Sequence, residues 1–423
     1  MERTMIANLR EMFGQKVKIQ GYLQTLRDQK KIQFLILRDP SGVVQVSFWK
    51  PNSAELAEQI SKLNTETALT ITGTVMDNPT VRLGGMELQL ETLEIAGNSD
   101  TPLPFDLFGE ILPPIDFRLD WRHLDLRRPE NMLIFKVQTT LEHALREYWI
   151  QHNFIEIHSP KLMGTPSESG AELFEVAYFD GKAYLAQSPQ FYKQMGVAAG
   201  FDKVFEIGPA FRADPSFTPR HMTEFTSIDM EMGWIESHED VMAFMERLLQ
   251  YAYQRVKDVH GEEVKRLLGR ELVVPTVPFP RITMAEAILI LKEAGYTLPP
   301  DKKGDIDPGG ERTLGDYIKQ KFDHDFFFLT DWPITARPFY HMRLPEDQNL
   351  TRSFDLIATG LEISTGAQRE HRYEILAQQA QEKGLNLEPI QNYLNFFRYG
   401  CPPHGGFGLG LSRLLMVMLG LPN

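Results

Sequence analysis

The chain has 423 residues, of which 42% are hydrophobic, and its formal net charge is −13. This length and apolar fraction predict two or more globular domains with sizeable cores. The negative charge excludes indiscriminate binding of nucleic acid by the whole surface, which needs many Lys and Arg contacts, although a local basic surface is allowed. One cysteine, Cys401, excludes an intrachain disulfide framework. A single cysteine suits a reducing cytoplasm, and the sequence shows no basic and apolar leader and no apolar run near 20 residues. These features predict a soluble cytoplasmic protein.

Residues 1–97 contain five short apolar runs separated by turn signals. This count predicts a small five-stranded β-barrel of the OB-fold type, with one short helix from Asn52 to Leu63. Four cations lie near Phe34 in the sequence, and a cation beside an exposed ring suits stacking with single-stranded bases. They are Arg27, Lys30, Lys31 and Arg38. An ordinary solvated hairpin fits the same pattern.

A proline-rich linker is expected over 98–130, because prolines break regular structure. The rest, 131–423, is predicted to be an α+β domain with a helical surface insertion around 280–325. Apolar residues at helical spacing predict core helices over Asn131–Asn153 and Glu239–Val259, the first followed by a strand that stops at Pro160.

The stretch Phe205–Trp234 reads as two strands joined by a charged loop. In the second strand one face is apolar, and the other carries Phe225, Ser227, Asp229 and Glu231. The loop supplies three groups that bind anions, namely Arg212, Arg220 and His221. An active-site hairpin and an ordinary hairpin with a solvated face both fit these residues.

Further polar groups stand at predicted strand ends and turns. Ser188, Gln190 and Lys193 could converge where a strand ends, and Glu168 lies in a loop rich in Gly and Ser. Asp355 and Glu362 flank a tight turn, so they could face each other as hard oxygen ligands for Mg²⁺. Each of these residues could also be an ordinary exposed polar side chain with no role in a site. The glycine-rich run before the last helix allows either a phosphate cradle or close backbone packing.

The string FRADPSFTPRHMTEF resembles the second signature motif of class II aminoacyl-tRNA synthetases. The resemblance implies that Arg212 holds the ATP α-phosphate and that Phe225 stacks on adenine. It also implies that the remaining residues contact ATP, namely Asp214, Arg220, His221 and Met222. Asp214 stands where this family usually has Glu.

Two other stretches resemble the remaining class II motifs. The helix and strand ending at Pro160 resemble the first motif, which implies a homodimer. The last stretch resembles the third motif, in which Arg413 holds the γ-phosphate. The resemblance also places Glu362 at ATP, together with Gly410, Leu411 and Ser412.

The string SPQFYKQ is similar to aspartyl-tRNA synthetases of the archaeal type. By this resemblance Lys193 and Arg369 bind the β-carboxylate of aspartate, with Arg369 as a bidentate fork. The other implied aspartate-binding residues are Glu168, Ser188, Gln190, Asp229 and Thr365. The implied Mg²⁺ site consists of Asp355, Glu362 and Thr365. The implied reaction joins L-aspartate to tRNA(Asp), with ATP converted to AMP and pyrophosphate.

The same resemblance makes the barrel an anticodon-binding domain, with contacts from Arg27, Phe34 and Gln45. Gln24, read near the start of the second barrel strand, stands where discriminating relatives often carry Trp, so tRNA(Asn) is a possible second partner. Two alternatives remain. One is a paralogue that passes activated aspartate to a non-tRNA acceptor, and the other is a non-catalytic tRNA-binding regulator.

Overall fold

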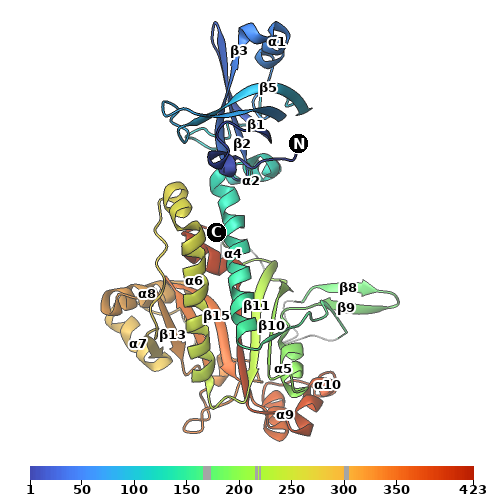
Figure 1. The fold of residues 1–423 in the computed structure, drawn as a ribbon. Helices are drawn as coiled ribbons and strands as arrows, with labels where there is room; N and C mark the ends of the chain where they lie inside the picture. The colour runs from blue at the N-terminus through green and yellow to red at the C-terminus, as the bar shows by residue number, and fades with distance from the viewer. Residues whose placement is uncertain (165–172, 215–217, 219–220, 300–303) are drawn as a thin grey trace. The chain divides into compact units, whose positions relative to one another are not determined.

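The computed structural model describes residues 1–164, 173–214, 218, 221–299 and 304–423. The chain divides into two compact units, Met1–Met132 and Leu133–Asn423, which are coloured by residue number in Figure 1. Each unit has its own hydrophobic core. Within the described ranges no helix combines the length and apolar character needed to cross a membrane.

The first unit contains a closed barrel with the strand order β1-β2-β3-β5-β4. Its strands are β1 (Lys16–Asp28), β2 (Ile32–Asp39), β3 (Gly42–Trp49), β4 (Ala68–Asp77) and β5 (Met86–Gly97). Alternate residues point inward and form the core, as the period of two requires. The helices are η1 (Ile6–Glu11), η2 (Lys50–Asn52), α1 (Ala54–Ser61), α2 (Ile115–Asp120) and α3 (Arg122–Asp125). The five-stranded OB-fold prediction is confirmed.

Two residues of the barrel differ from the expectation. Arg38 is not an exposed cation near Phe34, because it is 6% exposed and both guanidinium arms reach the Glu66 carboxylate at 2.6 Å. A buried charge needs such a partner. Gln24 lies inside β1, at the point where the pairing with β2 shifts register, and not near the start of the second strand.

The second unit is built on an eight-stranded sheet with the order β12-β13-β14-β15-β16-β11-β10-β6. The two outermost pairs, β12 with β13 and β10 with β6, are parallel, and the others are antiparallel. The strands are β6 (Ile155–Glu156), β10 (Lys203–Phe211), β11 (Glu224–Gly233), β12 (Arg281–Thr283), β13 (Phe326–Thr330), β14 (Ser353–Ala358), β15 (Leu361–Gln368) and β16 (His404–Gly410).

Three helices cover one face of this sheet and form the main core with it. They are α4 (Pro129–Gln151), α6 (His238–Leu268) and α11 (Leu411–Leu419). In Figure 1 α4 and α6 run side by side across the sheet, and the Tyr251 hydroxyl of α6 donates to Glu147 of α4. Ile228 and Met230 of β11 point into this core, together with Phe407 of β16. The opposite face is therefore left for polar groups.

The remaining elements surround the sheet. The segment 280–325, expected as a helical surface insertion, supplies the edge strand β12 and two helices that share a hydrophobic cluster with β13. A separate three-stranded sheet has the order β7-β9-β8. These and the last elements are α5 (Gln190–Ala198), α7 (Met284–Glu293), α8 (Pro308–Phe322), α9 (Tyr373–Glu382), α10 (Gln391–Leu394), η3 (Ile334–Ala336), η4 (Asn395–Tyr399), β7 (Leu162–Met163), β8 (Glu175–Tyr178) and β9 (Gly181–Leu185).

The glycine-rich run forms β16, a central strand that the sequence did not predict. Glycine weakens a strand in isolation, but it permits a close approach by neighbouring groups. A Cβ at Gly406 would overlap the Met230 carbonyl oxygen and the Glu231 carboxylate, and one at Gly408 would lie 3.2 Å from Asp229 Oδ1. The missing side chains thus leave room for two carboxylates of β11.

We expect Gly406→Ala to destabilise the second unit by more than about 3 kcal/mol, because the overlap involves backbone that cannot move aside. Thermal unfolding measures the effect. Gly164→Ala is the matched control, since its Cβ meets nothing within 4 Å. Equal unfolding midpoints for the two variants would contradict the packing argument.

Candidate functional site

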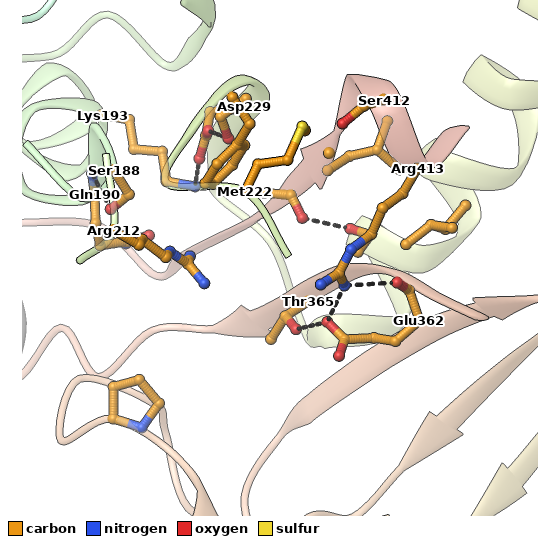
Figure 2. Close-up of a pocket in the computed structure, with 18 of the residues that line it drawn as sticks. Ser188, Gln190, Lys193, Arg212, Met222, Asp229, Glu362, Thr365, Ser412 and Arg413 are labelled. Carbon is orange, nitrogen blue, oxygen red and sulfur yellow. Dashed lines mark hydrogen bonds and ion pairs between the residues drawn. The ribbon is translucent and has the colours of Figure 1, made fainter. Parts of the chain in front are cut away.

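A pocket of about 290 Å³ opens on the polar face of the sheet. Its walls come from β11, β15 and β16, from the start of α5 and α11, and from the segments 212–214, 221–222 and 337–341. Figure 2 shows how residues from these distant segments converge. Predicted site residues in its lining are Ser188, Gln190, Lys193, Arg212, Asp214, His221, Met222, Phe225, Asp229, Glu362, Thr365, Arg369, Gly410, Ser412 and Arg413.

The predicted polar face of β11 is buried and not solvated. Ser227, Asp229 and Glu231 are 8%, 3% and 0% exposed. Buried carboxylates need cationic partners or hydrogen bonds. The structure supplies one such partner from α5, where Lys193 is 1% exposed.

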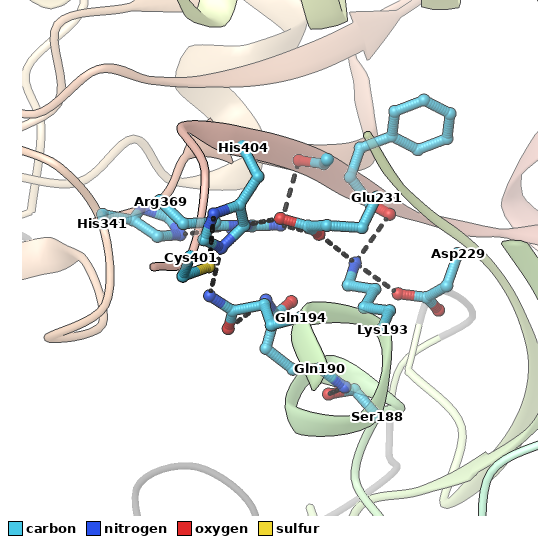
Figure 3. A network of polar contacts seen from close by, with 12 residues as sticks. Ser188, Gln190, Lys193, Gln194, Asp229, Glu231, His341, Arg369, Cys401 and His404 are labelled. Atoms are coloured by element: carbon cyan, nitrogen blue, oxygen red, sulfur yellow. Dashed lines mark hydrogen bonds and ion pairs between the residues drawn. The ribbon is translucent and has the colours of Figure 1, made fainter. Parts of the chain in front are cut away.

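Lys193 and Arg369 alternate with the two carboxylates in one buried network (Figure 3). The Lys193 ammonium donates to Asp229 Oδ1 at 2.9 Å and to the Phe407 carbonyl at 3.0 Å, and it lies 3.5 Å from Glu231 Oε2. Arg369 Nε donates to Glu231 Oε1 at 2.9 Å. Burial alone would raise the pKa of Glu231, but Arg369 and Lys193 lower it below its usual range. Glu231 is therefore ionised between two cations.

The expected bidentate fork of Arg369 on a substrate carboxylate is corrected by this geometry. Its Nε and Nη2 face Glu231, and Nη2 also donates to the Gly406 carbonyl at 3.0 Å. Its Nη1 donates to His341 Nε2 at 3.0 Å. Guanidinium has five donor hydrogens, so one N–H on Nη1 remains for a ligand. The fork is occupied because Glu231, buried on β11, requires it.

The pocket as a whole is rich in cations. The described lining residues include five cationic side chains against three carboxylates, although the whole chain is acidic. The Arg212 guanidinium lies 5.5 Å from the centre of the Phe225 ring, and Arg413 Nη1 donates to the Glu362 carbonyl at 2.8 Å. Low-dielectric walls strengthen this positive field.

Some predicted site residues lie elsewhere. Glu168 and Arg220 lie outside the described residues. Leu411, predicted at ATP, is 3% exposed and packs in the main core, because it starts α11 on the helix-covered side of the sheet. Its side chain therefore does not line the pocket.

The predicted metal ligands lie on the hairpin of β14 and β15. The Thr365 hydroxyl is 2.8 Å from Asp355 Oδ1 and 3.3 Å from Glu362 Oε1, so it links the two carboxylates. Arg337 pairs with Asp355 Oδ2 at 2.7 Å, yet burial raises the pKa of Asp355 to about 6. Among the described residues no cluster of three metal-binding side chains occurs. Mg²⁺ bound with ATP needs only one or two carboxylates, so these oxygens fit it.

Several lining residues were missed from the sequence. The lining residues Arg337, Tyr340 and His341 received no role. Glu231, which is fully buried and bonded to Arg369, was placed on the correct face of its strand but also received no role. The three lining residues follow β13 in an irregular loop, where no periodicity marks them. Only the pairing of that loop with the end of β15 brings them to the pocket.

In the barrel, the three predicted anticodon residues lie together. Arg27 stacks over the Phe34 ring at 5.4 Å and donates to Gln45 Oε1 at 3.1 Å. Gln45 in turn donates to Glu87 at 3.2 Å. A ring with a cation above it forms a stacking platform of the kind that single-stranded bases use.

Comparison with known families decides what this architecture is. Residues 114–423 match the model described as tRNA synthetases class II (D, K and N), and residues 17–96 match an OB-fold nucleic acid binding domain. The chain belongs to the class II tRNA synthetases. The family that the three sequence motifs suggested is therefore confirmed.

Two curated relatives cover nearly the whole synthetase. The chain is 44% identical to the aspartate–tRNA(Asp) ligase of Thermococcus kodakarensis, over 98% of this chain and 94% of the relative. It is 43% identical to the aspartate–tRNA(Asp/Asn) ligase of Methanopyrus kandleri, over the same shares.

Solved structures of similar fold include both asparaginyl- and aspartyl-tRNA synthetases. Asparaginyl-tRNA synthetase from Pyrococcus horikoshii with asparaginyl-adenylate matches with a TM-score of 0.91 and 33% identity, covering 100% of this chain and 96% of that one. A putative aspartyl-tRNA synthetase from Leishmania major matches with a TM-score of 0.90 and 31% identity, covering 100% and 92%. The backbone alone thus does not separate the two substrates.

His404, which Figure 3 shows bonded to Gln194, is held neutral. Its Nδ1 is 2.8 Å from the Pro402 carbonyl, which can only accept, so Nδ1 carries the proton and Nε2 accepts from Gln194 at 3.0 Å. Burial lowers the pKa of His404 to about 4, and burial also lowers the pKa of His238 to about 4. In His404 a second proton on Nε2 would also break the hydrogen bond from Gln194.

We expect the stability of the synthetase to fall as the pH drops from about 6.5 to 4. In that window the unfolded chain binds protons at both histidines and the folded chain does not, which costs up to about 3 kcal/mol for each ring. Thermal unfolding midpoints from pH 7 to 4.5 measure the slope. His404→Gln removes one titrating group, so its midpoint should vary less with pH; an unchanged slope would contradict the assignment.

Proposed function

We propose that this synthetase is an aspartate–tRNA ligase of the archaeal type. The observation that carries the proposal is the pair of buried cations, Lys193 and Arg369, at one end of a pocket whose other end is lined by Arg212 and Arg413. Two cations favour a side chain with a carboxylate over one with a neutral amide. The curated aspartate–tRNA ligases that match the full chain support the same substrate.

In the first step the aspartate α-carboxylate attacks the α-phosphorus of ATP, forming aspartyl-adenylate and releasing pyrophosphate. The α-carboxylate is already ionised, so the step needs no general base. Arg212 binds the α-phosphate and Arg413 the γ-phosphate, which offsets the charge on the transferring and departing oxygens. Phe225 stacks on the adenine ring, and Asp229 binds the substrate ammonium. Fixed positions for both reactants supply much of the acceleration.

Asp355, Glu362 and Thr365 would hold Mg²⁺ bound with ATP, which would neutralise phosphate charge when present. In the second step the terminal ribose hydroxyl of the tRNA attacks the adenylate carbonyl and releases AMP. Arg27, Phe34 and Gln45 bind the anticodon bases. We also propose that the enzyme is a homodimer of the reducing cytoplasm, a compartment that suits its single, buried Cys401.

The decisive experiment is aspartate-dependent exchange of pyrophosphate into ATP, followed by charging of separate tRNA(Asp) and tRNA(Asn) transcripts. We expect exchange with aspartate and charging of tRNA(Asp). Phe34→Ala should leave exchange unchanged and raise the KM for tRNA about tenfold or more, because base stacking contributes about 1–3 kcal/mol. Phe13→Ala is the matched control, since Phe13 is a phenylalanine of the same unit with an exposed ring.

Each alternative has its own outcome. Exchange without charging of either transcript would indicate the paralogue that uses another acceptor. Absence of exchange, with tRNA binding retained, would indicate the regulator. Charging of tRNA(Asn) as well as tRNA(Asp) would establish the broader specificity suggested by Gln24.

We expect removal of divalent metal with a chelator to abolish exchange, and added Mg²⁺ to restore it. Glu362→Gln should raise the Mg²⁺ concentration needed for half-maximal exchange by about tenfold, because one carboxylate ligand loses its charge. Glu388→Gln, at an exposed site, is the control. An unchanged Mg²⁺ requirement in Glu362→Gln would exclude this carboxylate as a ligand.

A further inference from the structure

His341 lies in the loop that borders the pocket beside Arg369. It is 3% exposed and contributes to the pocket lining. Its backbone forms an isolated antiparallel bridge with Arg369, and Met342 N donates to the Gln368 carbonyl at 3.0 Å. The loop is thus attached to the end of β15, and the ring is held against the guanidinium (Figure 3).

The hydrogen bond between these side chains fixes the state of the imidazole. Guanidinium can only donate, so the 3.0 Å contact makes His341 Nε2 the acceptor and leaves the proton on Nδ1. Burial and the charge of Arg369 lower the pKa of His341 well below its usual value, which agrees with a neutral ring. Within the described part of the chain Nδ1 has no hydrogen-bond partner. Among the described residues, the imidazole of His341 is therefore hydrogen-bonded through its side chain to Arg369.

His341 completes the set of acceptors around Arg369. Glu231 and the Gly406 carbonyl take one edge of the guanidinium, and His341 takes one hydrogen of Nη1. A single N–H then stays available on the pocket side. Because the guanidinium group is planar, the acceptors on its other hydrogens, His341 among them, together fix the direction of this remaining N–H.

We propose that His341 is a positioning residue that directs the free Nη1–H of Arg369 toward the substrate side chain and so enforces selection of a carboxylate. The inference deepens the aspartate-activating function proposed above and rests on it. A carboxylate offers one oxygen to Arg369 and the other to Lys193. An asparagine side chain must place its NH₂ group against one of these donors, which leaves a buried donor unpaired.

If His341 acts as an acceptor for Arg369, the variants His341→Gln and His341→Asn should behave differently, although both carry an amide. His341→Gln can place its Oε1 near the position of Nε2 and still accept from Nη1. In His341→Asn the amide ends near the position of Nδ1 and does not reach Arg369. His341→Leu provides an apolar side chain with no acceptor at all. The three variants therefore separate the acceptor from the volume and the polarity of the ring.

The test is exchange of pyrophosphate into ATP with aspartate or asparagine as substrate. We expect the Asn and Leu variants to raise the KM for aspartate about ten- to a hundredfold, as expected for a lost hydrogen bond to a charged group, with little change in kcat. In the same two variants, the ratio of kcat/KM for asparagine to kcat/KM for aspartate should rise. The KM for aspartate in the Gln variant should stay close to that of the wild type. The KM for ATP should be unchanged in all three variants.

The outcomes separate this proposal from the function on which it rests. Wild-type enzyme without aspartate-dependent exchange would overturn the proposed function. Active wild type, with Asn and Leu variants of unchanged aspartate KM, would overturn the role of His341. Equal losses in the Gln, Asn and Leu variants, or a KM for ATP that rises in parallel with that for aspartate, would identify a packing role and also overturn it. Thermal unfolding of each variant verifies that it is folded.

Discussion

The second unit depends on a row of alternating buried charges. Asp229 pairs with Lys193, and Glu231 lies between Lys193 and Arg369. Removing any one member would leave an uncompensated charge in the interior, which costs about 3–5 kcal/mol. The set is neutral as a whole, and that neutrality permits its burial on the sheet. Gly406 and Gly408 of β16 are part of the same arrangement, because a side chain at either position would take space next to these carboxylates.

A cationic pocket within an acidic protein follows from how the charges are distributed. The carboxylates in excess are spread over the rest of the chain, whereas the pocket collects five cationic side chains from segments that are far apart in the sequence. Walls of low dielectric focus this field on small anions. The net charge of a chain therefore says little about which ligand its site attracts.

Substrate choice in this family is a property of a few side chains and not of the fold. Solved structures named asparaginyl and aspartyl superimpose on this chain almost equally well, with TM-scores of 0.91 and 0.90. The difference between an amide and a carboxylate is a matter of charge and of donor direction. In the function proposed for this chain, both are controlled by Lys193, by Arg369 and by the neutral ring of His341.

Local pattern determined the elements whose signals are contiguous. The apolar runs and turn signals of residues 1–97 predicted the barrel, and the alternation in β11 predicted the hairpin. The spacing of apolar residues predicted α6, and the turn between Asp355 and Glu362 predicted the pair β14 and β15. Tertiary structure alone decided the rest, because the partners are distant in the chain. Arg369 meets Glu231 across 138 positions, and Lys193 meets the Phe407 carbonyl across 214. The burial of Arg38, the occupied fork of Arg369 and the strand built from glycines all follow from such contacts, which carry no periodic mark in the sequence.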